Sequence, residues 1–214
     1  MKRMKSLFIS FEGPEGAGKS SVMEAVAAVL SEQQELLVTR EPGGVRIAEE
    51  IREIILNPEN TALDGKSEML LFAAARRVHL LEKIKPALAA GKIVLVDRFI
   101  DSSVAYQGAA SGLDVADVKW LNDFATDGLK PDLTLFFDLE PEIGLARLMK
   151  DDAHEKNRLD LETLEYHKRV VAGYRALADE EPARIRRIDA SQSFDDVVAE
   201  VLAAITEKLS EVAD

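Results

Sequence analysis

Cysteine is absent from this chain of 214 residues, which excludes disulfides and thiolate metal sites and fits a reducing cytoplasm. No run of 18 apolar residues occurs either, so no membrane span is expected. Basic residues are scarce, since 27 Lys and Arg stand against 39 Asp and Glu and give a formal net charge of −12. Nucleic-acid binders usually carry an excess of basic residues, so that role is disfavoured. A small anionic ligand is still possible wherever cations gather locally.

The signatures of several enzyme classes are also missing. The three histidines, at positions 79, 154 and 167, are too scattered to form a metal site, and we assign them no catalytic role. No Ser-His-Asp pattern is visible. The N-K-x-D motif that a GTPase switch uses to read guanine is absent as well.

What the chain does contain is a regular alternation of short apolar runs and longer helical patterns. This order is typical of a parallel sheet covered by helices on both faces, built here from five strands. The N-terminal apolar run is short and ends at Glu12, so it reads as the first of these strands rather than a signal peptide. We expect one α/β domain over 1–214, with two domains as the weaker alternative. The expected strands are 6–13, 35–40, 92–98, 132–139 and 184–190, and the expected helices are 19–31, 46–56, 67–90, 115–126, 141–150, 162–179 and 194–210.

The stretch 150–161, "KDDAHEKNRLDL", is densely charged and has no apolar period. We interpret it as a mobile lid, with a solvated loop as the plainer alternative.

The segment 13–20, "GPEGAGKS", matches the P-loop pattern G-x-x-x-x-G-K-[ST]. It follows an apolar strand and precedes an amphipathic helix, which is the context that this motif requires. Its glycines allow main-chain N–H groups to converge on phosphate oxygens at a helix N-terminus. Lys19 is expected to reach the β- and γ-phosphates and Ser20 to hold Mg²⁺. The motif predicts binding of a nucleoside triphosphate.

The expected strand 92–98 closes on two adjacent charged residues, Asp97 and then Arg98. A P-loop motor would carry a second acid at this place to polarise water, whereas a cation indicates a second anion site. If the acceptor is a phosphate monoester, its second pKa near 6 means that it arrives ionised and needs no general base. Fixed guanidinium groups then bring the two anions together. A small-molecule kinase is therefore favoured over a switch or a motor.

Several stretches resemble the thymidylate kinase family of bacteria. They include "FEGPEGAGKS" (11–20), "TREPGG" (39–44), "LLFAAARRVHL" (70–80), "VDRFIDSSVAYQG" (96–108) and "NRLD" (157–160), in the family order. The resemblance implies a P-loop NTPase-like three-layer sandwich with a lid. It also implies transfer of the γ-phosphoryl group of ATP to dTMP with Mg²⁺, on the route to dTTP, in a cytoplasmic homodimer. Neither a nucleic acid nor a membrane is implied as a partner.

The resemblance also implies roles for single residues. Phe72 resembles the ring that stacks on thymine, Tyr106 the ring that crowds the sugar C2′, and Arg158 the catalytic arginine of the lid. The implied dTMP-binding residues are Glu15, Glu41, Arg52, Phe72, Arg76, Arg98, Ser103, Tyr106 and Gln107. The implied ATP-binding residues are Gly13, Pro14, Glu15, Gly16, Ala17, Gly18, Lys19, Ser20, Ser21 and Arg147. Ser20 and Asp97 are the implied metal residues, and Lys19, Arg98, Arg158 and Glu15 the implied catalytic ones.

The chain departs from the family pattern at Arg46, Val78 and Asn157. These departures bear on fine substrate geometry, because none of them removes a phosphate ligand. Two alternatives stay open at this point: another nucleoside monophosphate or deoxynucleoside kinase, and a nucleotide-binding regulator without catalysis.

Overall fold

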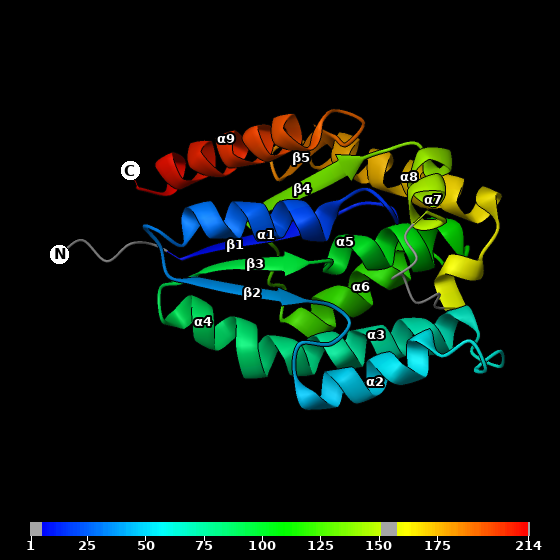
Figure 1. The fold of residues 1–214 in the computed structure, drawn as a ribbon. Coiled ribbons are helices and arrows are strands. Elements are labelled where there is room, and N and C mark those ends of the chain that lie inside the picture. Colours follow the sequence, from blue (N-terminus) through cyan, green and yellow to red (C-terminus); the bar gives the residue numbers. More distant parts are fainter. Residues whose placement is uncertain (1–5, 151–157, 214) are drawn as a thin grey trace.

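The computed structural model describes residues 6–150 and 158–213, so the expected lid lies largely outside the described residues. Five strands form one sheet in the order β2-β3-β1-β4-β5, and every neighbouring pair is parallel. Their carboxyl ends point the same way, toward the right in Figure 1. The predicted five-stranded parallel sheet is confirmed. The strands are β1 (Leu7–Glu12), β2 (Leu36–Arg40), β3 (Ile93–Asp97), β4 (Leu133–Asp138) and β5 (Ile185–Asp189).

Helices connect the strands and cover both faces of the sheet. They are α1 (Lys19–Leu30), α2 (Arg46–Leu56), α3 (Gly65–His79), α4 (Lys85–Ala89), α5 (Ile100–Ser103), α6 (Val115–Thr126), α7 (Pro141–Leu148), α8 (Leu164–Glu180) and α9 (Phe194–Ala213). Two π-helical segments, η1 (Leu80–Ile84) and η2 (Val104–Ala110), continue α3 and α5, and a 3₁₀ turn, η3 (Arg158–Leu161), precedes α8.

Alternate residues of the strands pack into hydrophobic clusters on the two faces of the sheet. On one face Ile9 and Phe11 of β1 pack with Val26 of α1 and Val201 of α9. On the other face Phe8 packs with the buried side chains of η1 and α4, while residues of β4 and β5 pack under η2 and α8. Since successive strand side chains point to opposite faces, this alternation produces three layers.

The expected helix 67–90 is interrupted by η1, which ends at Ile84, two residues before Pro86. Proline has no N–H to donate to the preceding turn, so the helical hydrogen-bond pattern changes there. No helix was expected over 100–110, where the structure has α5 and η2. This segment is rich in small residues and packs closely on α8: a Cβ on Gly173 would lie 2.7 Å from the Cβ of Ala109.

Among the described residues, no helix is both long and apolar enough to cross a membrane.

Candidate active site

The P-loop joins β1 to α1 at the carboxyl edge of the sheet. Gly16 has a φ of +67°, and a Cβ there would lie 2.1 Å from the carbonyl oxygen of Gly144 in α7. Only glycine fits this combination of left-handed backbone and close approach. Ala17 is buried in the core, whereas Gly18, Ser20 and Ser21 are exposed at the start of α1. The buried Ala17 and the contact between Gly16 and α7 thus anchor the loop. The residues at the start of α1 remain accessible to a ligand.

Lys19 is the buried cation of this loop. Its Nζ donates hydrogen bonds to the carbonyl oxygens of Gly13 at 3.0 Å and Pro14 at 2.8 Å. Burial, and then the positive charge of Arg98, lowers the pKa of Lys19 from 10.5 to about 8. A phosphate group near Lys19 would oppose both effects and favour its charged form.

Arg98 connects the P-loop to the cavity beside it. Its Nη1 donates to the carbonyl oxygen of Gly13 at 3.1 Å, and its Nη2 donates to Oε1 of Glu15 at 2.9 Å. The Glu15 carboxylate also accepts a hydrogen bond from the hydroxyl of Tyr106 at 2.5 Å. Burial acts to raise the pKa of Glu15, but Arg98 and then Lys19 outweigh it, and the pKa is lowered. Glu15 is therefore an anion held between two cations.

Asp97 and Ser20 meet across the same edge of the sheet. The Ser20 hydroxyl donates to Oδ2 of Asp97 at 2.7 Å, while Oδ1 of Asp97 is buried and has no hydrogen-bond partner. A divalent cation beside this oxygen would satisfy it, so the pair fits Mg²⁺, which binds through one or two protein oxygens, phosphates and water. No group of three or more His, Asp and Glu within the described chain could hold a metal ion on its own.

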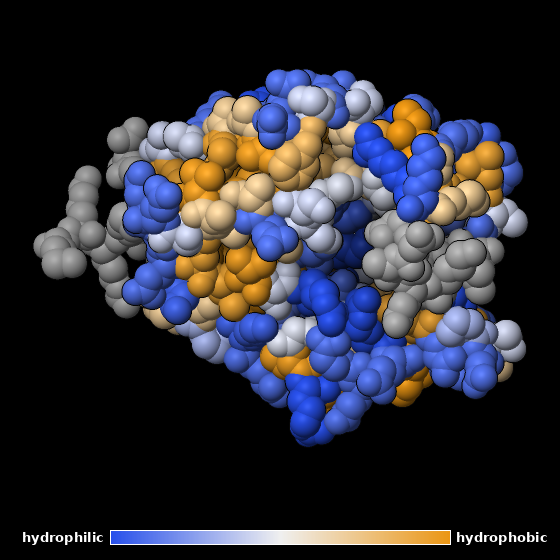
Figure 2. All heavy atoms as spheres, viewed as in Figure 1, coloured by the Kyte–Doolittle hydropathy of each residue, from blue (hydrophilic) through white to orange (hydrophobic). Residues whose placement is uncertain are grey.

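A cavity of about 320 Å³ opens from the P-loop toward α2 and α3. Figure 2 shows a recess on this face, bordered by hydrophilic residues. Its walls carry four cations, Lys19, Arg52, Arg76 and Arg98, against three acids, Glu15, Glu41 and Asp97. The cavity lining has a charge of 4 − 3 = +1 in a chain of net charge −12. Cations are therefore concentrated at the place where an anionic ligand needs them.

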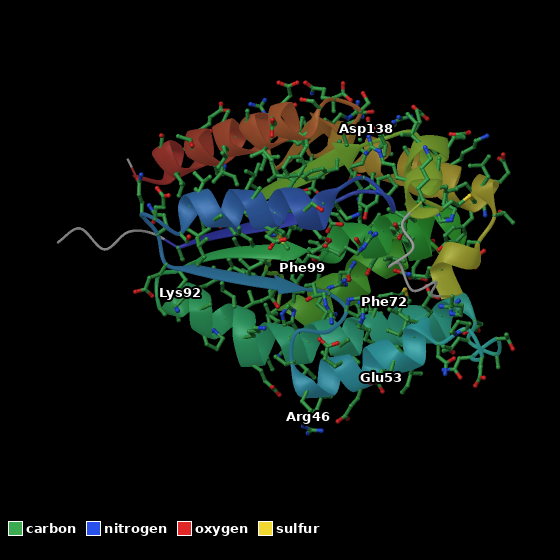
Figure 3. All side chains as sticks on the ribbon, in the orientation of Figure 1. Arg46, Glu53, Phe72, Lys92, Phe99 and Asp138 are labelled. Carbon is green, nitrogen blue, oxygen red and sulfur yellow. The ribbon has the colours of Figure 1, made fainter. Side chains whose placement is uncertain are left out.

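Phe72 and Arg76 both line the cavity from α3. Figure 3 shows Phe72 on α3, below the ends of β2 and β3. Phe72 is half-buried, whereas Arg76 is only 2% exposed. Arg76 donates from Nε to Glu41 at 2.8 Å and from Nη1 to Ser103 at 3.0 Å. Phe72 and Arg76 thus share one face of α3, and Arg76 also holds Glu41 and Ser103, two other predicted residues, in place.

The remaining acceptor-side candidates gather around the same cavity. Arg52 donates to the carbonyl oxygen of Pro42 at 3.0 Å. Gln107 is buried and donates from Nε2 to Oε1 of Glu68 at 2.6 Å. Together with the contacts above, the structure brings all nine predicted dTMP-binding residues to the cavity wall or into direct contact with a residue that lines it. The nine are Glu15, Glu41, Arg52, Phe72, Arg76, Arg98, Ser103, Tyr106 and Gln107.

Two predicted arginines lie outside the cavity wall. Arg147 of α7 is exposed and donates to the carbonyl oxygens of Gly16 and Ala190, each at 3.3 Å, so it lies beside the P-loop. Arg158 donates from Nε to the carbonyl oxygen of Ile55 at 3.1 Å and pairs with Glu68. In this structure the Arg158 guanidinium is thus bound on the α2 and α3 side and does not reach toward the P-loop.

The departures from the family pattern lie at the margins of the site. Arg46 begins α2, is exposed and points away from the body of the molecule (Figure 3). Val78 is half-buried on α3, and neither residue lines the cavity. Asn157 and His154 lie outside the described residues.

The other two histidines are buried against site residues. His79 contacts Thr39 at 2.8 Å and Glu41 at 3.0 Å, and the Nδ1 atom of His167 lies 3.9 Å from Oε2 of Glu15.

Sequence reasoning missed a set of buried and half-buried polar residues under and beside the site. Glu12, Ser102 and Tyr174 form hydrogen bonds with one another beneath Arg98, and Asn122 accepts a hydrogen bond from Arg76 at 2.5 Å. Glu12 and Tyr174 are separated by 162 positions in the chain, so spacing along the sequence carries no signal of their contact. The one available signal was the charge of Glu12 at the end of an apolar strand.

Comparison with known proteins agrees with this geometry. The family model described as "Thymidylate kinase" matches residues 11–201. A crystal structure of thymidylate kinase from Ehrlichia chaffeensis is 34% identical and has a TM-score of 0.77, covering 94% of this chain and 99% of that one. The P-loop, the Asp97–Arg98 strand end and the cationic cavity all lie within the matched residues. The chain belongs to the thymidylate kinase family.

Proposed function

We propose that the cavity holds dTMP, that the P-loop holds the phosphates of ATP, and that Arg98 lies where the two meet. As a member of the thymidylate kinase family, the chain is an ATP-dependent phosphotransferase that converts dTMP to dTDP. The assignment of residues to the two substrates rests on the position of Arg98. Its guanidinium contacts Gly13 and Glu15 of the P-loop and also lines the cavity.

Phosphoryl transfer in this site depends on position and charge. The dTMP phosphate is already ionised near neutral pH, so no side chain has to remove a proton from it. Two anions must instead be held together against their repulsion, and Arg98 and Lys19 supply the fixed positive charge. Arg52 adds a third cation on the acceptor side, where its pKa is lowered by burial and by the neighbouring Arg40. In this proposal Lys19 and Arg98 are the principal catalytic groups, and Glu15 holds Arg98 and faces the sugar.

Ser20 and Asp97 would hold Mg²⁺ beside the donor phosphates. The ion would supply positive charge that neutralises the donor phosphates during transfer. The unpartnered Oδ1 of Asp97 and its bond from Ser20 support this assignment.

Base and sugar recognition is assigned to the far end of the cavity. The Phe72 ring stacks on thymine, and Arg76, Ser103 and Gln107 line the base edge. The Tyr106 ring, whose hydroxyl is fixed by Glu15, narrows the space beside C2′ and favours deoxyribose. Gly13 to Ser21 surround the triphosphate, and Arg147 lies where it can cover the adenine ring. Arg158 can take part in catalysis only if its guanidinium group leaves Glu68 when both substrates are bound.

We further propose that residues 1–214 form one kinase domain with a lid at 150–161, and that two copies associate. Exposed apolar residues on neighbouring helices support an interface: Ile54 on α2, Leu70 on α3, and Trp120 and Phe124 on α6. The last two are 66% and 71% exposed and stack at 5.7 Å. Helix α3 contacts both α2 and α6, and exposed apolar residues on adjacent helices are typical of a protein interface. The absence of cysteine supports a cytoplasmic location.

A panel of nucleoside monophosphates, assayed with ATP and Mg²⁺ by coupled ADP release, tests the proposal. We expect dTMP to be the preferred acceptor by at least about tenfold in kcat/KM, since Phe72, Gln107 and Tyr106 select base and sugar. Preference for another monophosphate would favour the alternative kinase. The absence of ADP release with every acceptor, in a protein that binds ATP, would favour the non-catalytic regulator.

A further inference from the structure

The backbone at Arg98 is in an uncommon conformation. Its φ is +68°, in the left-handed region that residues with a side chain rarely occupy. Two hydrogen bonds from main-chain N–H groups tie the turn to β1: the N–H of Arg98 donates to the carbonyl oxygen of Phe11 at 3.0 Å, and the N–H of Phe99 donates to the side-chain Oε1 of Glu12 at 2.7 Å. Such a conformation persists only where the surroundings fix it. Glu12 is the side chain that does so here.

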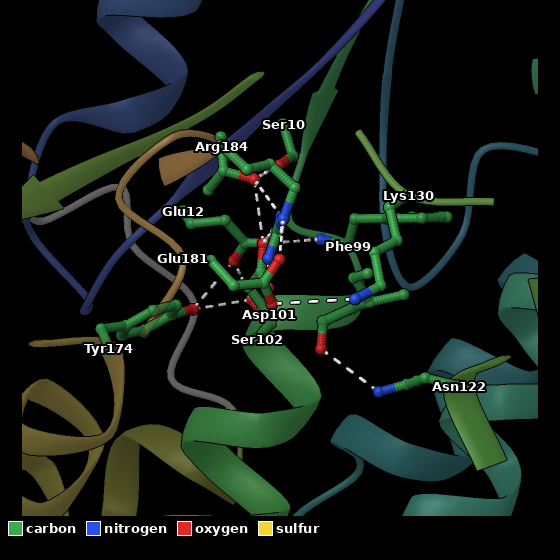
Figure 4. Close-up of polar contacts among 12 residues, drawn as sticks. Ser10, Glu12, Phe99, Asp101, Ser102, Asn122, Lys130, Tyr174, Glu181 and Arg184 are labelled. Atoms are coloured by element: carbon green, nitrogen blue, oxygen red, sulfur yellow. Dashed lines mark hydrogen bonds and ion pairs between the residues drawn. The ribbon is translucent and has the colours of Figure 1, made fainter. Parts of the chain in front are cut away.

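The other oxygen of the same carboxylate organises the surface beneath the Arg98 guanidinium. Oε2 of Glu12 accepts hydrogen bonds from the hydroxyls of Ser102 at 2.6 Å and Tyr174 at 2.9 Å. These two hydroxyls lie 2.8 Å apart, and each lies 3.4 Å from Nη1 of Arg98. Figure 4 shows Glu12 among Phe99, Ser102 and Tyr174. One side chain therefore holds both the backbone of Arg98 and the groups under its charged end.

Glu12 has no access to substrate. It is 0% exposed and is not among the residues that line the cavity. A second buried acid, Asp101, lies close by, but Arg184 binds both of its oxygens at 2.8 Å. Arg98 is the cavity cation that contacts Ser102 and Tyr174, the two hydroxyl partners of Glu12. A buried carboxylate is retained at a cost in desolvation, so its position calls for a role beyond packing.

We propose that Glu12 is a positioning residue for Arg98, fixing the left-handed turn and the hydroxyl pair beneath the guanidinium so that Arg98 meets the acceptor phosphate in a preset geometry. This inference rests on the proposed assignment of Arg98 to the dTMP phosphate. Preset geometry matters because ordering a flexible arginine during binding would weaken affinity.

A double-mutant cycle between Glu12→Ala and Arg98→Ala tests the proposal, with the dissociation constants of dTMP and ATP measured by calorimetry. We expect Glu12→Ala to weaken dTMP binding roughly 10- to 100-fold and to leave ATP binding within about threefold. Since Glu12 acts through Arg98, the combined variant should bind dTMP no more weakly than Arg98→Ala alone, within about twofold.

Asp132→Ala is the matched control. Its carboxylate accepts a main-chain hydrogen bond from Phe8 at 2.8 Å, at the opposite end of β1 from the cavity. A loss of stability without a change in dTMP affinity is expected for this control.

If Glu12→Ala does not fold, Glu12→Gln and Tyr174→Phe serve in the same cycle. The glutamine keeps an oxygen for the N–H of Phe99, so we expect partial rescue relative to alanine. Effects that add to those of Arg98→Ala, or equal losses for dTMP and ATP, would overturn the role of Glu12. Unchanged dTMP affinity in Arg98→Ala alone would instead overturn the proposed function of Arg98, so the two failures are distinguishable.

Discussion

Asp97 and Arg98 are consecutive residues with different tasks, and the backbone explains how both reach one cavity. Consecutive side chains of an extended strand point to opposite faces of the sheet. The chain leaves the extended conformation at Arg98, where φ is +68°, and both side chains then line the cavity. The pairing of a metal-binding acid with a phosphate-binding cation therefore depends on this one turn.

A residue of the site could be predicted from the sequence where it belongs to a local motif. Lys19 and Ser20 follow from the P-loop pattern, and Arg98 from its position after a buried strand. The support under Arg98 could not be predicted in this way. Ser102 and Tyr174 look like ordinary polar residues in the sequence, and only the packing of α8 on α5 and η2 brings them to Glu12.

The pKa of Glu12 yields a prediction for stability. Burial, and then the nearby charge of Asp101, raises the pKa of Glu12 from 4.5 to about 7. The folded state then holds more protons than the unfolded state between these pH values, so the contribution of Glu12 to stability is present below pH 4.5 and lost as pH rises through 7. Over this window the shift corresponds to about 3 kcal/mol.

Glu12→Gln cannot titrate, so we expect its free energy of unfolding to rise relative to the wild type as pH increases from 5 to 8. Urea unfolding of both proteins at the two pH values measures this difference. Asp132→Ala is the control, because it leaves the Glu12 carboxyl and its hydrogen-bond partners in place and should keep the pH dependence. A Glu12→Gln effect that is the same at both pH values would contradict the raised pKa.

At the scale of elements, hydrophobic patterning predicted all five strands to within two residues at each end, because a buried parallel strand is a short continuous apolar run. It did not predict the helical segment 100–110. That stretch has no clear helical period, since the small residues Ala105, Gly108 and Ala109 lie among polar ones. Tertiary packing decides its structure: η2 lies against α8, where Gly173 allows the two backbones to approach.

Gly173→Ala tests this close approach. The added methyl group would lie 2.7 Å from the Cβ of Ala109 and 3.1 Å from the Cα of Ala105, and neither atom belongs to a flexible side chain. We expect a loss of roughly 1–3 kcal/mol in urea unfolding, since overpacking outweighs the better helix propensity of alanine. Gly65→Ala on α3 is the control, because its new Cβ would meet nothing closer than 3.7 Å. Equal or higher stability of Gly173→Ala would disprove the tight contact.

At the scale of the whole molecule, the apolar residues exposed on α2, α3 and α6 predict self-association. Phe124→Glu places a charge in the stacked pair with Trp120, so we expect the variant to sediment as a monomer at concentrations where the wild type sediments as a dimer. Val29→Glu on α1, on the other face of the sheet, removes another half-exposed apolar residue and should leave the dimer intact. A wild-type protein that is monomeric throughout would refute the interface.

Positive and negative charges are unevenly distributed over the molecule. Its net charge of −12 would repel two nucleotides, yet the cavity lining is cationic because Lys19, Arg52, Arg76 and Arg98 converge from four separate segments. Composition predicted the acidic surface but not the convergence, which the sheet topology creates by aligning the carboxyl ends of its strands. The proposed phosphoryl transfer therefore depends on Arg98 binding the phosphate of the acceptor.

Calorimetric titration of Arg98→Ala with dTMP and, separately, with ATP and Mg²⁺ tests that claim most directly, with Arg175→Ala as a control on a half-buried arginine outside the cavity. We expect turnover to be abolished, dTMP binding to weaken by about 100-fold or more, and ATP binding to change by no more than a few-fold. The control should match the wild type in both titrations. Loss of ATP binding with unchanged affinity for dTMP would contradict the account.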